Sequence, residues 1–224
     1  MSIYVGASYQ ETGGAKEKAD ELIDMVYGFA QKWPDKYAMA FSVADVKDQF
    51  AKGLVSLPMG MENGAPIEDD ILNLKYFYER GKRYITLCHS KWTIKCDSTY
   101  DPDKHLNGLS PFGKEVVKEM NRLGILVDIS HVSDSAFYQV VEITKAPLVA
   151  THSSCRHYTP GFERNMSDDM IRKLAENGGV IQINFGTYFI NGDHQQKMSK
   201  AWDNIDRSNM TAEERTVYIK NYML

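Results

Sequence analysis

The chain has 224 residues, of which 43% are hydrophobic and 25% are charged, a composition typical of a folded globular protein. Its formal net charge of −4 argues against nucleic acid or an anionic membrane as the main partner. Its apolar runs are shorter than the roughly 20 residues that a membrane span requires. Three scattered cysteines are too few for a disulfide scaffold or a four-thiolate zinc site. We expect residues 1–224 to form one domain.

A repeated pattern of helix, glycine and short apolar strand organises the chain. Apolar spacing predicts a helix over residues 15–30, and Gly124 is typical of a left-handed helix C-terminus. Ser110, Ser133 and Ser167 are predicted N-caps. The apolar runs predict six strands, beginning near Ile3, Leu54, Tyr84, Ile125, Leu148 and Val180. Strands alternating with helices at this spacing indicate βαβ units and a parallel sheet.

Two segments fall outside this pattern. Residues 90–108 are too long for a simple connection and directly follow a predicted strand, so we expect a lid or a binding loop. The polar tail, residues 192–224, is expected to be helical, and Thr211 with Glu214 fits a capping box.

Polar residues end four of the predicted strands. They are Glu62, His89, His131 and His152, and they include three of the six histidines in the chain. In α/β proteins, catalytic groups lie at the carboxyl ends of the strands, so these side chains are expected to converge on one face. A carboxylate with several imidazoles is a ligand set that Zn²⁺ favours.

A purely structural reading of each of these residues is also open. A single histidine is more often a hydrogen-bonded structural residue than a metal ligand, and Glu62 could be only a neighbour of a helix start. The combination of all four favours a site. His105 and His194 are expected to be solvated, and His157 is left outside the site because it lies in a loop.

Other reactive residues give weaker indications. Arg164 follows the fifth predicted strand, where it could bind a substrate carboxylate with its planar fork or simply lie on the surface. Cys155 lacks the strained turn that would indicate a nucleophile. Cys88 is expected to pack in the barrel wall, and Asp128 to support a neighbouring histidine.

Several motifs of the chain resemble those of the membrane dipeptidase family, also called renal dipeptidases or M19 metallopeptidases. The similarity runs from about residue 2 to residue 185 and weakens afterwards. The motifs that carry it are GLSPFGKEVV (108–117), LVDISHVS (126–133), THSS (151–154), RNM (164–166) and ENGGVIQINF (176–185).

The resemblance implies a fold and a set of roles. That family is similar to the metal-dependent amidohydrolases, which have a (β/α)₈ TIM barrel holding two zinc ions. Glu62 would be the catalytic carboxylate bridging both metals, and His131 and His152 would hold the second metal. His89 would bind the substrate and stabilise the tetrahedral intermediate. Arg164 would bind the terminal carboxylate of the substrate.

The chain also departs from the family pattern. The family places a His-x-Asp pair on its first strand, and none occurs before Glu62. It also places an aspartate in a Ser-Asp-Phe-Asp-Gly-like segment, and none occurs before Leu224. We therefore expect an α/β, incomplete TIM barrel of the metal-dependent hydrolase type, an internal piece with about six of eight strands. Such a chain is expected to bind one zinc ion and to be weakly active or inactive.

The resemblance predicts zinc-dependent hydrolysis of the peptide bond of dipeptides. The expected partner is a dipeptide substrate, with a homodimer as a further possibility. Two alternatives stay open: a non-catalytic barrel remnant, and an amidohydrolase that acts on cyclic amides or lactams.

Overall fold

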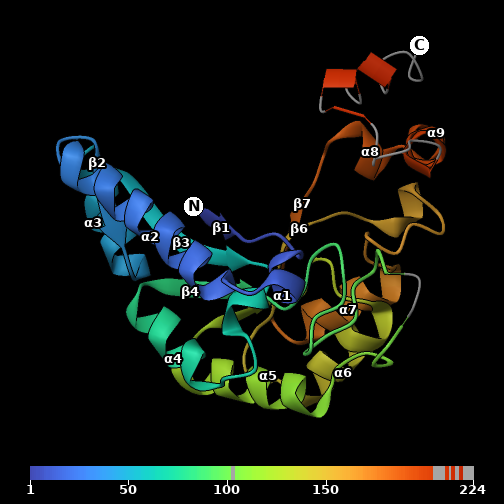
Figure 1. Ribbon diagram of the computed structural model, residues 1–224, viewed down its shortest axis with the longest axis horizontal. Coiled ribbons are helices and arrows are strands. Elements are labelled where there is room, and N and C mark those ends of the chain that lie inside the picture. Colours follow the sequence, from blue (N-terminus) through green and yellow to red (C-terminus); the bar gives the residue numbers. More distant parts are fainter. Residues whose placement is uncertain (102–103, 204–209, 212, 215–216, 219–224) are drawn as a thin grey trace.

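Parallel strands form one sheet in the computed structural model, which describes all residues except 102–103, 204–209, 212, 215–216 and 219–224 (Figure 1). The strand order is β1-β3-β4-β5-β6-β7, and β2 pairs with β3. Every pairing between these strands is parallel. The strands are β1 (Ser2–Tyr4), β2 (Tyr37–Ala40), β3 (Val55–Glu62), β4 (Lys82–Thr86), β5 (Leu126–Asp128), β6 (Val149–Ser153) and β7 (Val180–Ile183).

The six predicted strands are confirmed, and β2 is an addition. The long strand β3 pairs with β2 along its first half, Tyr37 opposite Val55, and with β1 along its second half, Tyr4 opposite Glu62. The six predicted strands form the path β1-β3-β4-β5-β6-β7, and β2 lies off it, with Phe41 just after β2 accepting a hydrogen bond from Arg83 of β4 at 2.7 Å. The fold is the partial α/β barrel that the sequence predicts.

Helices connect the strands and cover the sheet. The N-caps Ser110, Ser133 and Ser167 each accept a hydrogen bond from a backbone N–H in the first turn, as predicted. Gly124 ends α5 at φ 78°. The helices are α1 (Tyr9–Thr12), α2 (Ala15–Lys32), α3 (Val43–Ala51), η1 (Ala65–Ile67), α4 (Leu72–Glu79), α5 (Pro111–Leu123), α6 (Asp134–Ile143), η2 (Arg156–Tyr158), α7 (Asp168–Glu176), α8 (Thr187–Ile190) and α9 (Gly192–Asp203).

The hydrophobic core lies between the sheet and its helices. Buried side chains such as Met61, Ile85 and Val127 from the strands pack with Phe77 and Phe137 from the helices. Helices α4, α5 and α6 follow one another along one side, whereas α8 and α9 lie together away from them (Figure 1). Within the described residues, every helix is too short or too polar to cross a membrane.

The polar tail is partly helical where it is described. Helix α9 occupies its first part. Thr211 and Glu214 form the expected capping box, because the backbone N–H of each donates to the side chain of the other, at 2.7 and 3.2 Å. Most of the remaining tail lies outside the described residues.

Candidate metal centre

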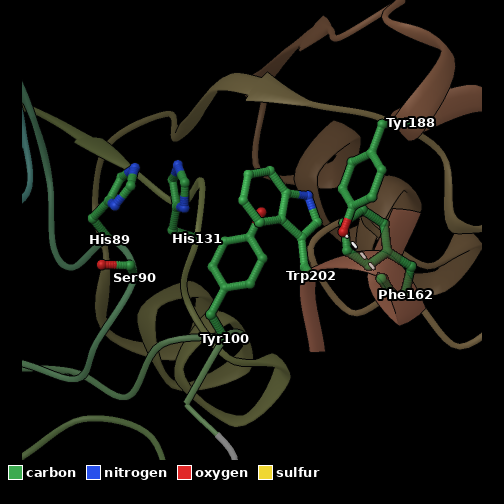
Figure 2. A pocket seen from close by; sticks show the side chains of 8 residues that line it. His89, Ser90, Tyr100, His131, Phe162, Tyr188 and Trp202 are labelled. Atoms are coloured by element: carbon green, nitrogen blue, oxygen red, sulfur yellow. Dashed lines mark hydrogen bonds between the residues drawn. The ribbon is translucent and has the colours of Figure 1, made fainter. Parts of the chain in front are cut away.

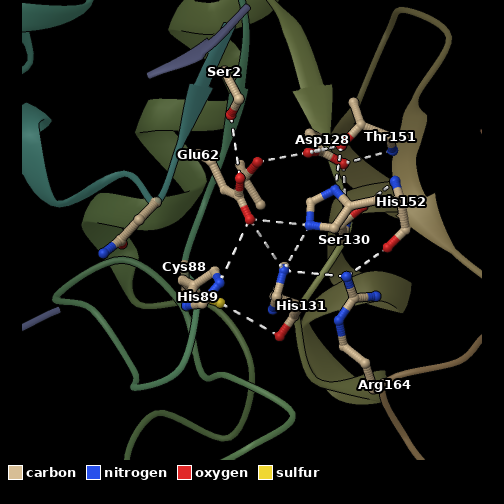
Figure 3. Close-up of polar contacts among 12 residues, drawn as sticks. Ser2, Glu62, Cys88, His89, Asp128, Ser130, His131, Thr151, His152 and Arg164 are labelled. Carbon is tan, nitrogen blue, oxygen red and sulfur yellow. Dashed lines mark hydrogen bonds and ion pairs between the residues drawn. The ribbon is translucent and has the colours of Figure 1, made fainter. Parts of the chain in front are cut away.

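Of the four polar residues at the strand ends, the three histidines converge on one carboxylate oxygen of the fourth, Glu62 (Figure 3). Glu62 ends β3, His89 and His131 each follow a strand by three residues, and His152 lies in β6. The Oε1 atom of Glu62 lies 3.5 Å from Nε2 of His89, 3.6 Å from Nε2 of His131 and 3.1 Å from Nε2 of His152. Adjacent parallel strands place their carboxyl ends side by side, which brings the four side chains together.

His131 reaches this point through an unusual backbone. Its φ is +68°, in the left-handed region that residues other than glycine rarely adopt. Its carbonyl oxygen accepts a hydrogen bond from the backbone N–H of Thr99, which lies in the long loop after β4. The side chain is 6% exposed. Strain of this kind concentrates at functional sites, where the surrounding structure holds it in place.

A hydrogen-bonded chain orients the imidazole of His152. The hydroxyl of Thr151 donates to Oδ2 of Asp128 at 2.6 Å and lies 2.7 Å from Nδ1 of His152. Because that hydroxyl proton is directed to the carboxylate, Nδ1 of His152 is the donor to Thr151 and Nε2 keeps its lone pair. The same Oδ2 accepts from Thr86 at 2.5 Å. Asp128 therefore supports a neighbouring histidine, as expected, but through an intervening threonine.

The environment sets the protonation state of the centre. Contacts with His131 and His152 hold the pKa of Glu62 well below its ordinary value. Burial lowers the pKa of His131 to about 3 and also lowers that of His89. At neutral pH the carboxylate is therefore ionised and these two imidazoles are neutral, which is the state in which they bind a metal ion.

The donor set fits a divalent metal ion. Ligand atoms of Glu62, His89 and His131 all lie within 4.8 Å of one another, and His152 contacts both Glu62 and His131. The Nδ1 atoms of His89 and His131 are buried and have no hydrogen-bond partner among the described residues, so these rings lack the anchoring expected of purely structural histidines. The distance from Glu62 to His89 is about the same as the distance from Glu62 to His131. His89 is therefore placed as well as His131 to act as a ligand.

Arg164 is buried beside the centre rather than lying on the surface. It is 3% exposed. Its Nη1 donates to Oγ of Ser153 at 2.8 Å, and its Nη2 donates to the carbonyl of His152 at 2.5 Å and lies 3.1 Å from Nε2 of His131. Its Nε has no hydrogen-bond partner among the described residues.

A cavity of about 600 Å³ opens beside the histidines (Figure 2). His89 and His131 lie at one end of it, and four aromatic residues line the rest together with Ser90 and Ser199. The long loop after β4 contributes Ser90 and Tyr100, so part of the expected binding loop does line the cavity. The remaining rings, which the sequence did not indicate, are Phe162, Tyr188 and Trp202.

The other reactive residues lie outside this group. His105 and His157 are exposed, and His194 is half-buried on α9. Cys155 is a partly exposed free thiol, and Cys88 is fully buried, as expected for the wall of the sheet.

The fold and the site together define a candidate metal-binding enzyme of the α/β barrel class. Residues 1–211 match the sequence model of the membrane dipeptidase family, peptidase family M19. The chain is 33% identical over 176 residues to dipeptidase tcpJ of Claviceps purpurea, covering 79% of this chain and 41% of that protein. It is 36% identical over 165 residues to dipeptidase verJ of Clonostachys rogersoniana, covering 74% of this chain and 42% of that protein.

Solved structures agree with this assignment. Dipeptidase AC, a metallopeptidase of family M19, superposes with a TM-score of 0.78 at 26% identity, covering all of this chain and 66% of the other. The probable dipeptidase PvdM of Pseudomonas aeruginosa gives a TM-score of 0.79 at 24% identity, covering 97% of this chain and 60% of that one, and shows the shared fold. The chain belongs to the membrane dipeptidase family, M19, and spans less than half the length of the two fungal dipeptidases.

Proposed function

We propose that this chain carries the zinc-binding part of a dipeptidase, in which Glu62, His131 and His152 hold the ion. The observation that supports this most strongly is the meeting of imidazole Nε2 atoms at one oxygen of an ionised carboxylate. Nitrogen and oxygen donors of this kind suit Zn²⁺. When bound, the ion lowers the pKa of water and polarises a carbonyl oxygen, the chemistry that peptide hydrolysis requires.

His89 is proposed to stabilise the reacting carbonyl group. It lies at the wall of the large cavity, and its lowered pKa keeps the ring neutral at physiological pH. A neutral imidazole with an Nε2–H can donate a hydrogen bond to the oxygen on which negative charge develops, without repelling a neighbouring cation. The same Nε2 faces Glu62 at 3.5 Å, so His89 reaches both the substrate side and the metal side of the centre.

Arg164 is proposed to fix the carboxylate of the dipeptide. Its guanidinium group lies against His131 and lines a further cavity of about 430 Å³ together with Tyr100. Tyr100 and Phe162 line both cavities, so the two spaces flank the same pair of rings. A carboxylate held at Arg164 would place the neighbouring peptide bond close to His131 and favour very short peptides.

The proposal is tested by metal counting combined with a substrate panel. The purified chain is saturated with zinc, desalted and assayed for zinc per chain, for binding of a phosphinate mimic of a dipeptide, and for turnover of dipeptides and cyclic amides. We expect one zinc per chain, zinc-dependent binding of the mimic, and weak turnover restricted to dipeptides. Turnover of cyclic amides without dipeptides, or binding of the mimic that does not depend on zinc, would overturn it.

A further inference from the structure

A cavity of about 400 Å³ lies apart from the candidate metal centre. It is open to solvent and is lined by α1 and the start of α2, by η1 and the turn after it, and by the loop after β4, and none of its lining residues lines the two cavities beside the histidines. Its charged lining residues are Lys95, Glu68 and Asp69. The segments that follow the neighbouring strands β1, β3 and β4 thus build a second concave site at the carboxyl ends of the strands.

Lys95 is the deepest charged group of this cavity. The residue is 1% exposed, and its Nζ makes no hydrogen bond to any residue that the structure describes. The nearest aromatic ring, that of Phe112, is centred 5.8 Å from Nζ. Protonating a buried amine that has no hydrogen-bonded partner is costly, and an anionic ligand at Nζ would offset that cost.

The backbone of Lys95 is held by hydrogen bonds on both sides, which fixes where its side chain leaves the main chain. Its carbonyl oxygen accepts a hydrogen bond from the backbone N–H of Ser110 at 3.0 Å, and its own N–H donates to Oγ1 of Thr93 at 3.2 Å. The same carbonyl packs so closely on Gly113 that a Cβ there would lie 2.0 Å from it. The N-terminal turn of α5 therefore positions Lys95 against the cavity.

The charges of the cavity are arranged by depth. Lys95 is buried, whereas Glu68 and Asp69 are exposed and therefore form the rim. Burial lowers the pKa of Lys95 to about 7, against the opposing influence of Asp69, Glu68 and the thiol of Cys96. An anion that reaches Nζ would favour the protonated amine, and a cation at the rim would pair with the carboxylates.

We propose that this cavity binds a small zwitterion, a free α-amino acid, with its carboxylate at Lys95 and its ammonium group at Glu68 and Asp69. The volume of about 400 Å³ lies within the range of small-molecule sites and accommodates a single amino acid. Amino acids are also the products of dipeptide hydrolysis, but binding here is independent of the metal centre because the two sites share no lining residue.

Calorimetric titration of the full chain with leucine tests the proposal, with acetate and methylamine as half-ligands. Titrations at pH 7.5 in two buffers of different ionisation enthalpy report the protons taken up. We expect leucine to bind at least 10-fold more tightly than either half-ligand, with uptake of more than about 0.5 proton per ligand. Leucine binding and proton uptake are expected to be lost in Lys95→Met.

Matched variants make the result specific. Lys91→Met removes an exposed lysine of the same loop, and Lys82→Met removes another buried lysine whose pKa is also lowered to about 7 but which contacts Met59 instead of a cavity. Both are expected to bind leucine like the unmodified chain. Glu62→Gln, at the metal centre, is also expected to retain leucine binding, whatever its effect on zinc.

A pair of rim substitutions keeps the test valid if Lys95→Met fails to fold. The double variant Glu68→Gln with Asp69→Asn changes only exposed side chains. We expect it to weaken the binding of leucine at least 10-fold while leaving the binding of acetate unchanged. The proposal is overturned if leucine gives no binding heat, if the rim variant binds leucine normally, or if Glu62→Gln abolishes leucine binding.

Discussion

The Nε2 atoms of His131 and His152 lie 2.7 Å apart. The chain from Asp128 through Thr151 places the proton of His152 on Nδ1, so its Nε2 presents a lone pair. Both rings therefore direct Nε2 toward one point beside the carboxylate of Glu62. Two basic nitrogens and an anionic oxygen at this spacing are donors of the kind that divalent metal ions take, as the proposed function requires.

Removing the orienting hydroxyl is expected to weaken zinc binding. In Thr151→Val the side chain keeps its shape but no longer links Asp128 to His152, so the imidazole is free to turn or to change tautomer. We expect zinc affinity to fall 10- to 100-fold, measured by competition with a chelating dye. Thr144→Val removes a threonine hydroxyl at the end of α6, remote from the strand ends, and should leave zinc affinity unchanged.

The metal-free chain is expected to lose stability as the pH falls from about 6.5 toward 3. The pKa of His131 is 6.5 for an unperturbed histidine, as in the unfolded chain, and about 3 in the folded chain. The unfolded state therefore binds more protons across this pH window. The pKa values of His89 and Glu62 are shifted in the same direction, so their contributions add. All three contributions are complete above pH 6.5.

Urea unfolding at several pH values in the presence of a chelator measures this effect. His131→Asn should flatten the dependence by up to about 1.4 kcal/mol per pH unit. Asparagine suits this position because it tolerates the positive φ. The exposed His157→Asn serves as the control, and an unchanged slope in His131→Asn would refute the assignment.

Replacing either of two helical glycines by alanine should change the free energy of unfolding, but in opposite directions. Gly28 lies within α2, and apart from its chain neighbours and its own helix backbone no atom of the described residues lies within 4 Å of the place that a Cβ would take, so Gly28→Ala should raise the free energy of unfolding by about 1 kcal/mol. Gly113→Ala would drive its methyl group into the carbonyl of Lys95, and we expect a loss of about 3 kcal/mol. Denaturant unfolding of both variants checks the pair, and similar effects would contradict the packing described.

The aromatic wall of the large cavity should contribute to ligand affinity. Phe162 lies edge-on to Tyr188, with ring centroids 5.0 Å apart, and faces the space beside the histidines. Phe162→Ala is expected to weaken the binding of a phosphinate dipeptide mimic that carries an aromatic side chain. The affinity should fall about 10-fold, because the loss of one ring contact costs roughly 1.4 kcal/mol. Phe185→Ala, at a ring that is 83% exposed, should have no effect on the dissociation constant.

The strand pattern was predictable because buried parallel strands are marked by apolar runs. Strand β2 was missed because its four residues, YAMA, are few and include alanine and methionine, which favour a helix rather than a strand. It exists through its pairing with the first half of β3, a tertiary relationship that local sequence does not reveal.

The residues of the site divide in the same way. Glu62, His89 and His131 could be identified because strand ends converge by topology, which follows from the repeat. The hydroxyls of Ser2 and Thr151 could not, because their contacts with Glu62 and Asp128 depend on exact side-chain positions. The aromatic wall is assembled from two loops and from helices α8 and α9, which share no periodic signal.

Zinc binding by single-site variants tests the metal centre most directly. Equilibrium dialysis followed by metal analysis should give one zinc per unmodified chain. Glu62→Gln and His152→Asn should each lower the affinity at least 100-fold, while the exposed His105→Asn should bind as the unmodified chain does. Equal zinc retention in all of these chains would show that the four strand-end residues do not form a metal site.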